Sequence, residues 1–214
     1  DSSILQEIDK DKILGFHRLS INDISNYGSQ PLNHPEDNNL ILICNGEIYN
    51  HKELVKKNNF KTVSKSDCEV ILHLYKKYGI LDTLNQLDGV FSLVLVDKNK
   101  NKVIVARDPF GVRGLFYSID NQELMICSEM KGLSDLCESV KPFPSSHFYD
   151  SSLEGNKFVR YFSVPCLEVG DDENIILKNI NEKFTNAVVK VDLVNLQKAL
   201  SNFLTKGPVV KKSL

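Results

Sequence analysis

The chain has 214 residues, of which 42% are apolar and 25% are charged, an ordinary composition for a globular protein. Its formal net charge of −2 gives no electrostatic support for binding nucleic acid or an acidic membrane surface. Its apolar runs have the length of strands, well short of the ~20 residues that a membrane helix needs. No histidine lies at ligand spacing from a pair of its five cysteines, so we expect no metal site, and reduced thiols favour a cytoplasmic protein.

The first expected elements are strands. Alternating apolar residues from Ile13 to Leu19 suit a strand. A second apolar run, from Leu40 to Cys44, stops at Asn45-Gly46. An Asn-Gly pair after a strand is typical of a tight turn, because both residues tolerate positive φ, so a turn is predicted there.

Two helices are expected next. Ser66 to Tyr78 has apolar residues on one face, and Ser66 with Glu69 three positions later forms a capping-box pattern. Gly79 can end this helix. Leucines at regular spacing between Leu81 and Leu87 predict a short second helix.

The middle of the chain is rich in hairpins. Val90 to Asp97 and Val103 to Ala106 flank a polar turn, and Leu115 to Ser118 and Leu124 to Cys127 form a second pair of strands. Met130 to Leu136 suits one or two helical turns. Tight turns rather than crossover helices join these strands, which predicts an antiparallel α+β fold with helices packed over sheets.

The character of the sequence changes after Pro165. Glu173 to Val189 and Val191 to Leu204 have helical patterns and suggest two helices, with Gly207-Pro208 as a stop. The expected organisation is therefore one domain over residues 1–165, followed by a helical linker, or the start of a further region, over residues 166–214.

Four residues have side chains or backbone groups that suit an amino-acid ligand. Each has an ordinary structural explanation alone: Arg18 at a strand end, Asn45-Gly46 in a turn, Asp67 at the start of a helix. Together they offer more. An arginine can grip a carboxylate with two hydrogen bonds, an aspartate can hold an ammonium group, and an asparagine beside a glycine N–H can direct two donors at one oxygen.

The motif Asn-Gly-Glu-Ile-Tyr-Asn-His at 45–51 resembles the signature of the class II glutamine amidotransferase domain of asparagine synthetases. Further motifs are similar to that family in the same order: His-Arg-Leu-Ser-Ile at 17–21, Ser-Asp-Cys-Glu at 66–69, Leu-Asp-Gly-Val-Phe at 87–91, Arg-Asp-Pro-Phe-Gly-Val-Arg at 107–113 and Ser-Glu-Met-Lys-Gly-Leu at 128–133. The resemblance implies an N-terminal nucleophile hydrolase fold, a four-layer αββα sandwich of antiparallel sheets.

The resemblance also implies a pocket for L-glutamine. Arg18 would bind the α-carboxylate of glutamine. Asp67 would hold its α-ammonium group, helped by Glu47 and by backbone near Ile21. The side chain of Asn45 and the N–H of Gly46 would form the oxyanion hole, and no cofactor is implied for this domain. Arg107 and Asp108 are expected to pair as ions and fix a turn.

The sequence departs from the resembled family at its first residue. The family nucleophile is an N-terminal cysteine whose own α-amino group acts as base, whereas position 1 here is Asp1. We therefore expect that the first strand and the nucleophile are missing and that this chain does not hydrolyse glutamine by itself.

Two functions remain open at this point. The first is the glutaminase domain of an asparagine synthetase, supplying ammonia for asparagine biosynthesis. ATP and Mg²⁺ would then be needed only by a separate synthetase domain, in cis or in trans. The alternative is an inactive glutamine-binding or scaffold module derived from the same family.

Overall fold

The chain divides into two compact units, Asp1–Ser163 and Val164–Leu214. The computed structural model describes residues 2–18, 28–120, 123–155, 157–164 and 172–206, with backbone only for Ser2, Arg18 and residues 190–206. No helix within these ranges is long and apolar enough to cross a membrane. The domain boundary expected between residues 165 and 166 stays a prediction.

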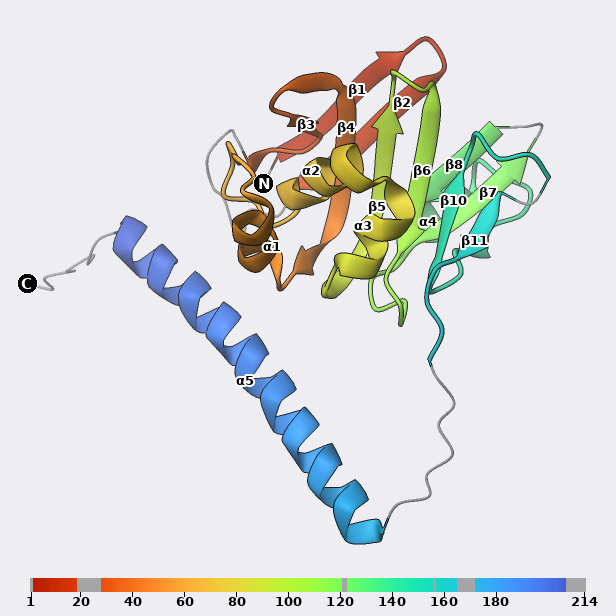
Figure 1. The fold of residues 1–214 in the computed structure, drawn as a ribbon. Coiled ribbons are helices and arrows are strands. Elements are labelled where there is room, and N and C mark those ends of the chain that lie inside the picture. Colours follow the sequence, from red (N-terminus) through yellow and green to blue (C-terminus); the bar gives the residue numbers. More distant parts are fainter. Residues whose placement is uncertain (1, 19–27, 121–122, 156, 165–171, 207–214) are drawn as a thin grey trace, which may run out of the picture. The chain divides into compact units, whose positions relative to one another are not determined.

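The strands described for the first unit form three antiparallel sheets (Figure 1). A hairpin consists of β1 (Ser2–Asp9) and β2 (Lys12–Arg18). The six-stranded sheet has the order β11-β10-β6-β5-β4-β3, formed by β3 (Leu32–His34), β4 (Asp37–Ile48), β5 (Gly89–Asp97), β6 (Lys102–Arg107), β10 (His147–Asp150) and β11 (Phe158–Arg160). The third sheet has the order β8-β7-β9, formed by β7 (Phe116–Asp120), β8 (Glu123–Cys127) and β9 (Lys141–Pro142).

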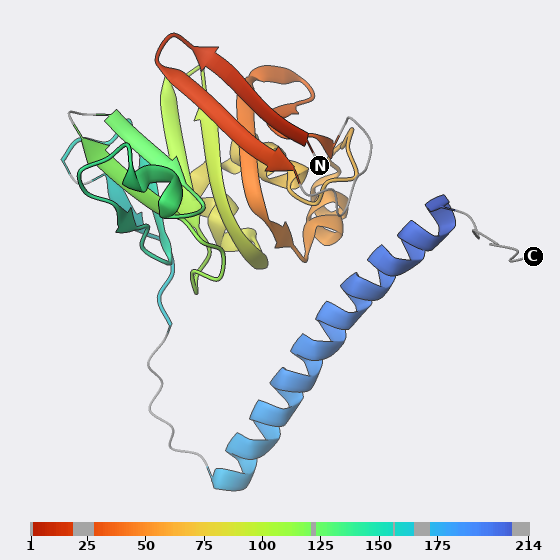
Figure 2. The same cartoon turned by 180° about the vertical axis from the view of Figure 1, so that it is seen from behind.

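In the described part of the first unit, four helices accompany these sheets: α1 (His51–Asn58), α2 (Glu69–Tyr78), α3 (Ile80–Gln86) and the short α4 (Lys131–Ser134). Helices α1 to α3 cover one face of the six-stranded sheet, as Figure 1 shows. The β1–β2 hairpin and the three-stranded sheet cover the opposite face, seen from behind in Figure 2. The expected α+β fold of facing antiparallel sheets with a helical layer is confirmed, as are the β5–β6 and β7–β8 hairpins.

Strand alternation explains why this sheet is buried on both faces. In β4, Leu42 and Cys44 point to the helices, whereas Ile41 points to the other face. In β5, Leu95 likewise points to the helices and Val96 to the other face. Successive side chains of a strand point to opposite faces, so runs in which every residue is apolar bury two cores at once.

Strand β4 contradicts the predicted turn at Asn45-Gly46, because it continues unbroken to Ile48. Gly46 is needed for a different reason. A Cβ at Gly46 would lie 2.3 Å from the carbonyl oxygen of Val90 and 2.7 Å from the Cα of Phe91. The glycine therefore permits close approach of β4 and β5 rather than a change of direction.

The start of α2 differs from the predicted capping box. The helix begins at Glu69, and its N-cap residue Cys68 makes no side-chain capping bond. The Ser66 hydroxyl accepts the Cys68 N–H (3.3 Å), and the Glu69 carboxylate accepts the N–H groups of Val63 (2.9 Å) and Ser64 (2.7 Å). The carboxylate thus accepts hydrogen bonds from the loop before the helix and not from the first turn of the helix itself.

The second unit contains α5 (Glu173–Lys206), a single helix of 34 residues. The prediction of two separate helices is therefore wrong. Neither glycine nor proline occurs within the helix, so nothing in its sequence forces a break near Val191. Apolar side chains such as Ile180 and Phe184 are exposed.

Candidate functional site

The predicted site residues Asn45, Gly46 and Glu47 lie together near the end of β4. Burial decreases along the face of β4 that carries Asn45: Ile41 is buried, Ile43 is half-buried and Asn45 is exposed. Glu47 is on the same face by strand alternation and is half-buried. The polar residues Asn45 and Glu47 therefore lie at the end of β4 where this face of the six-stranded sheet becomes accessible to solvent.

The backbone of Gly46 points away from β5. Gly46 pairs with Phe91, whose N–H and C=O both bind Asp108 on the other side of β5, at 3.3 Å and 2.8 Å. Opposed residues in an antiparallel pair exchange either two hydrogen bonds or none, so Gly46 and Phe91 form a pair without hydrogen bonds. The N–H of Gly46 therefore points to the outer edge of β4.

Two side chains bind the backbone on either side of Gly46 at that edge. The amide of Gln30 accepts the N–H of Cys44 at 2.6 Å, and the carboxylate of Asp67 accepts the N–H of Ile48 at 2.7 Å. Residues two apart in a strand direct their N–H groups to the same side. Cys44, Gly46 and Ile48 thus form a row of three donors, and Gly46 is in the middle.

Asp67 was predicted at the first position of a helix but lies in the turn before α2. It is buried, and its bond to Ile48 ties the turn to the end of β4. The structure therefore brings Asp67 to the strand that carries the other three site residues. Gln30 was not predicted from the sequence, where a glutamine before a proline carries no signal of a partner in β4.

Arg18 is the last residue of β2, opposite Ser2, and only its backbone is described. The start of β2 is held by a bond from Lys12 to Asn101 (3.3 Å), beside the β5–β6 turn. Strand β4 also starts at that turn, where Asn39 binds Asn99 (2.8 Å). Both strands run away from it, so Arg18 lies toward the same end of the sheets as Asn45. Ile21 lies outside the described residues.

The two cysteines nearest to the site residues in sequence are not candidate nucleophiles. Cys44 and Cys68 are both buried in the core beneath the helices. The adjacent Cys44 thiol and burial hold the pKa of Cys68 well above its usual range. A protonated, buried thiol is a poor nucleophile. Among the described residues, no group of histidine, cysteine and carboxylate side chains could hold a metal ion.

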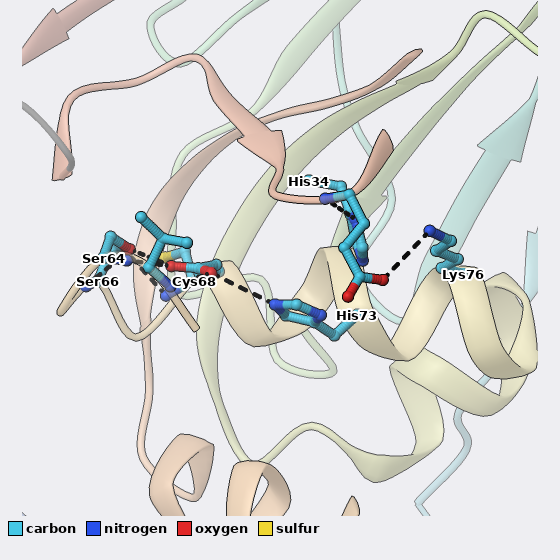
Figure 3. A network of polar contacts seen from close by, with 9 residues as sticks. His34, Ser64, Ser66, Cys68, His73 and Lys76 are labelled. Atoms are coloured by element: carbon cyan, nitrogen blue, oxygen red, sulfur yellow. Dashed lines mark hydrogen bonds and ion pairs between the residues drawn. The ribbon is translucent and has the colours of Figure 1, made fainter. Parts of the chain in front are cut away.

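A polar network supports the loop that carries Asp67 (Figure 3). Burial alone would raise the pKa of Glu69, but hydrogen bonds from His73, Ser64 and Val63 outweigh it, and the pKa of this carboxyl is lowered. The ring of His34 lies 4.6 Å from that of His73. Burial, with the nearby charges of His73 and Lys76, lowers the pKa of His34.

These shifts predict a loss of stability in acid. A folded-state pKa of His34 below its unfolded value near 6.5 means that the unfolded chain takes up a proton first, so stability falls as the pH drops below about 6.5. Glu69 adds stability above its unfolded pKa near 4.5 that is lost as the pH falls through its lowered folded value. Urea unfolding between pH 7.5 and 5.5 should show a shallower loss for His34→Gln than for the parent. Equal slopes in the parent and in His34→Gln would contradict the assignment.

The loop after β6 does not contain the expected ion pair between Arg107 and Asp108. The Arg107 guanidinium instead donates to the carbonyl oxygens of Arg113 (2.8 Å), Phe143 (2.7 Å) and Gly111 (2.8 Å). Asp108 binds backbone N–H groups of the same loop. The guanidinium thus binds backbone carbonyl oxygens, and the carboxylate binds backbone N–H groups, so each charge has backbone partners in place of the other.

Comparisons with known proteins identify the family of this domain. Residues 3–185 match the family described as "Glutamine amidotransferase domain". Asparagine synthetase [glutamine-hydrolyzing] 1 of Arabidopsis thaliana is 43% identical over 184 residues, which cover 84% of this chain and 30% of that protein. The asparagine synthetase of Sandersonia aurantiaca is 46% identical over 186 residues, covering 84% and 34%. The chain thus spans about a third of the length of these relatives.

Solved structures show the same fold. The glutamine phosphoribosylpyrophosphate amidotransferase of B. subtilis, complexed with ADP and GMP, matches with a TM-score of 0.59 at 24% identity, over 70% of this chain and 35% of that one. A structure titled as the allosteric regulatory enzyme of purine biosynthesis matches with a TM-score of 0.54 at 24% identity, over 63% and 31%. At this identity the likeness concerns the fold alone.

Proposed function

Because the chain belongs to the family of glutamine amidotransferase domains, we propose that it binds L-glutamine at the exposed end of β4. The observation that carries the proposal is the outward N–H of Gly46 beside the exposed side chain of Asn45, with the carboxylate of Asp67 tied to the same strand. Two donors and a carboxylate suit the side-chain amide and the α-ammonium group of one glutamine.

In this proposal Arg18 grips the α-carboxylate of glutamine, and Asp67 and Glu47 hold its α-ammonium group, with backbone near Ile21. The N–H of Gly46 and the side-chain amide of Asn45 then donate to the side-chain oxygen. As the amide carbon is attacked, that oxygen gains negative charge, and preformed donors stabilise it.

Hydrolysis of the bound glutamine would give glutamate and ammonia, the nitrogen source for an amide-forming synthetase. We propose that the attacking thiol is none of the five cysteines of this chain. The burial of Cys44 and Cys68 supports this proposal for those two residues. Aspartate activation with ATP and Mg²⁺ would be carried out by a synthetase domain acting in cis or in trans. The glutamine-binding domain would need no cofactor. The working location would be the cytoplasm.

Titration of the 214-residue chain with L-glutamine, followed by NMR or calorimetry, tests the proposal. Arg18→Ala should weaken binding by about tenfold or more, because a charged hydrogen bond contributes about 1.5–3 kcal/mol. Asp67→Asn should weaken it by a similar factor, since the amide can still accept the Ile48 N–H but no longer attracts the ammonium group.

Arg160→Ala is the matched control, because Arg160 is exposed and, within the described part of the chain, its side chain donates to the nearby carbonyl oxygen of Phe162 (2.9 Å). It should bind glutamine as the parent does. Absence of glutamine binding by the parent chain would refute the proposed function. Parental affinity in Arg18→Ala would refute the role of that residue.

A further inference from the structure

Gln30 is buried (9% exposed), and its side chain contacts both backbone groups of one residue of β4. Its amide oxygen accepts the N–H of Cys44 at 2.6 Å, and its amide nitrogen donates to the carbonyl oxygen of Cys44 at 2.9 Å. A single planar amide thus makes the two hydrogen bonds that a residue of a neighbouring strand would make.

The register of the sheet explains this substitution of side chain for backbone. Leu32 lies opposite Leu42 and Asn33 opposite Ile41, so continuing the same antiparallel register places Gln30 opposite Cys44. Strand β3 begins only at Leu32, and Pro31 has no N–H to donate. The Gln30 side chain therefore extends the pairing of β4 past the end of its neighbouring strand.

Gly46 lies between two such fixed points. Gln30 holds Cys44 on one side, and Asp67 holds Ile48 on the other. Glycine can adopt a wider range of φ and ψ than any other residue. The intrinsic preferences of Gly46 therefore do not fix the direction of its N–H, and the neighbouring contacts must do so. A hydrogen bond weakens steeply as its angle departs from linearity, so the direction of this N–H decides its usefulness as a donor.

From this arrangement we infer that Gln30 is a positioning residue for the glutamine site. It holds the outer edge of β4 so that the Gly46 N–H points at the side-chain oxygen of the bound glutamine. Gln30 occupies the Cys44 backbone and does not itself touch the ligand. The inference rests on the proposed function and adds to it a residue that acts through the strand.

The test uses Gln30→Met, which keeps the length of the side chain and removes both hydrogen bonds. Binding of two ligands to the 214-residue chain is followed by ¹⁵N–¹H NMR. L-Glutamine has the side-chain oxygen, whereas L-norvaline keeps the α-ammonium and α-carboxylate groups and lacks it. Gln30→Met should bind glutamine roughly three- to tenfold more weakly, the value of one neutral hydrogen bond, and norvaline as the parent does.

Thr83→Val is the matched control for a loss of stability. Thr83 is fully buried, and its hydroxyl donates to the carbonyl oxygen of Gly79 (2.7 Å), the residue just before α3. Removing it costs one buried side-chain to backbone bond away from β4. Thr83→Val should bind both ligands with parental affinity.

The possible results separate this inference from the proposed function. Parental glutamine affinity in Gln30→Met, or an equal loss for both ligands, would overturn the positioning role. If the parent does not bind glutamine, the proposed function is refuted. The effect of Gln30 on the Gly46 N–H can then still be tested in spectra recorded without ligand. In those spectra the Gly46 amide signal should move in Gln30→Met while that of Ile48, held by Asp67, stays in place. An unmoved Gly46 signal would overturn the inference.

Discussion

Gly46→Ala should lower the free energy of unfolding by about 3 kcal/mol or more, the upper range for overpacking a tightly packed site. The new methyl group would lie 2.3 Å from the Val90 carbonyl oxygen and 2.7 Å from the Phe91 Cα. Both contacts are with backbone of the central strand β5, which cannot turn aside as a side chain could. Relief requires β4 and β5 to move apart where they pair. Urea unfolding of parent and variant measures the difference.

Gly15→Ala provides the control for this prediction. Gly15 is also in a strand, but among the described residues a Cβ there would meet a side-chain atom, Cδ1 of Leu5, at an ordinary 3.6 Å. Alanine in a strand gains roughly 0.5–1 kcal/mol over glycine through the entropy of the unfolded chain, so this variant should be as stable as the parent or slightly more. Equal stability of Gly46→Ala and Gly15→Ala would show that the two strands are not packed as closely as described.

Asp108→Ala should destabilise the protein by about 3–4 kcal/mol, because one buried carboxylate accepts several backbone N–H groups. Asp108 is 1% exposed. It accepts the N–H groups of Phe91 (3.3 Å), Phe110 (3.0 Å), Val112 (3.1 Å) and Arg113 (3.2 Å). These bonds tie the loop after β6 to β5. Alanine would leave the donors without an acceptor and a small cavity beside them.

Two companion variants identify the cause of that loss. Asp108→Asn keeps one acceptor oxygen and nearly the same volume, so its effect should be smaller than that of alanine. Asp135→Ala removes an exposed carboxylate and should change the free energy of unfolding by no more than about 0.5 kcal/mol. Asparagine and alanine variants of equal stability would mean that the hydrogen bonds to the one oxygen that asparagine retains contribute nothing.

The sequence predicted the strands of the core and missed the causes of two local features. Val90 to Asp97 reads as a strand because every residue is apolar or suits a buried pleat. Asn45-Gly46 is misleading because the need for a glycine comes from β5, far along the chain, and a local pattern cannot distinguish close approach from positive φ. The capping-box pattern at Ser66 fails for a related reason, since Glu69 binds the loop instead.

The candidate site was predicted in part for similar physical reasons. Asp67 has a side chain whose chemistry suggests a ligand, and the fold then supplies its position through Ile48. Gln30 has no such chemistry on its own. Its importance arises only from the register that sets it opposite Cys44, which depends on the pairing of β3 with β4. Residues that act through the backbone of another strand are therefore the hardest to find from a sequence.

The outer edge of β4 also bears on the solubility of the protein. An exposed strand edge with consecutive free N–H and C=O groups can pair with a strand of another molecule and start aggregation. Here Gln30 covers both backbone groups of Cys44, and Asp67 covers the N–H of Ile48. An incoming strand would find its hydrogen-bonding positions taken on either side of Gly46. The same two side chains that flank the Gly46 N–H thus protect the edge against a polypeptide.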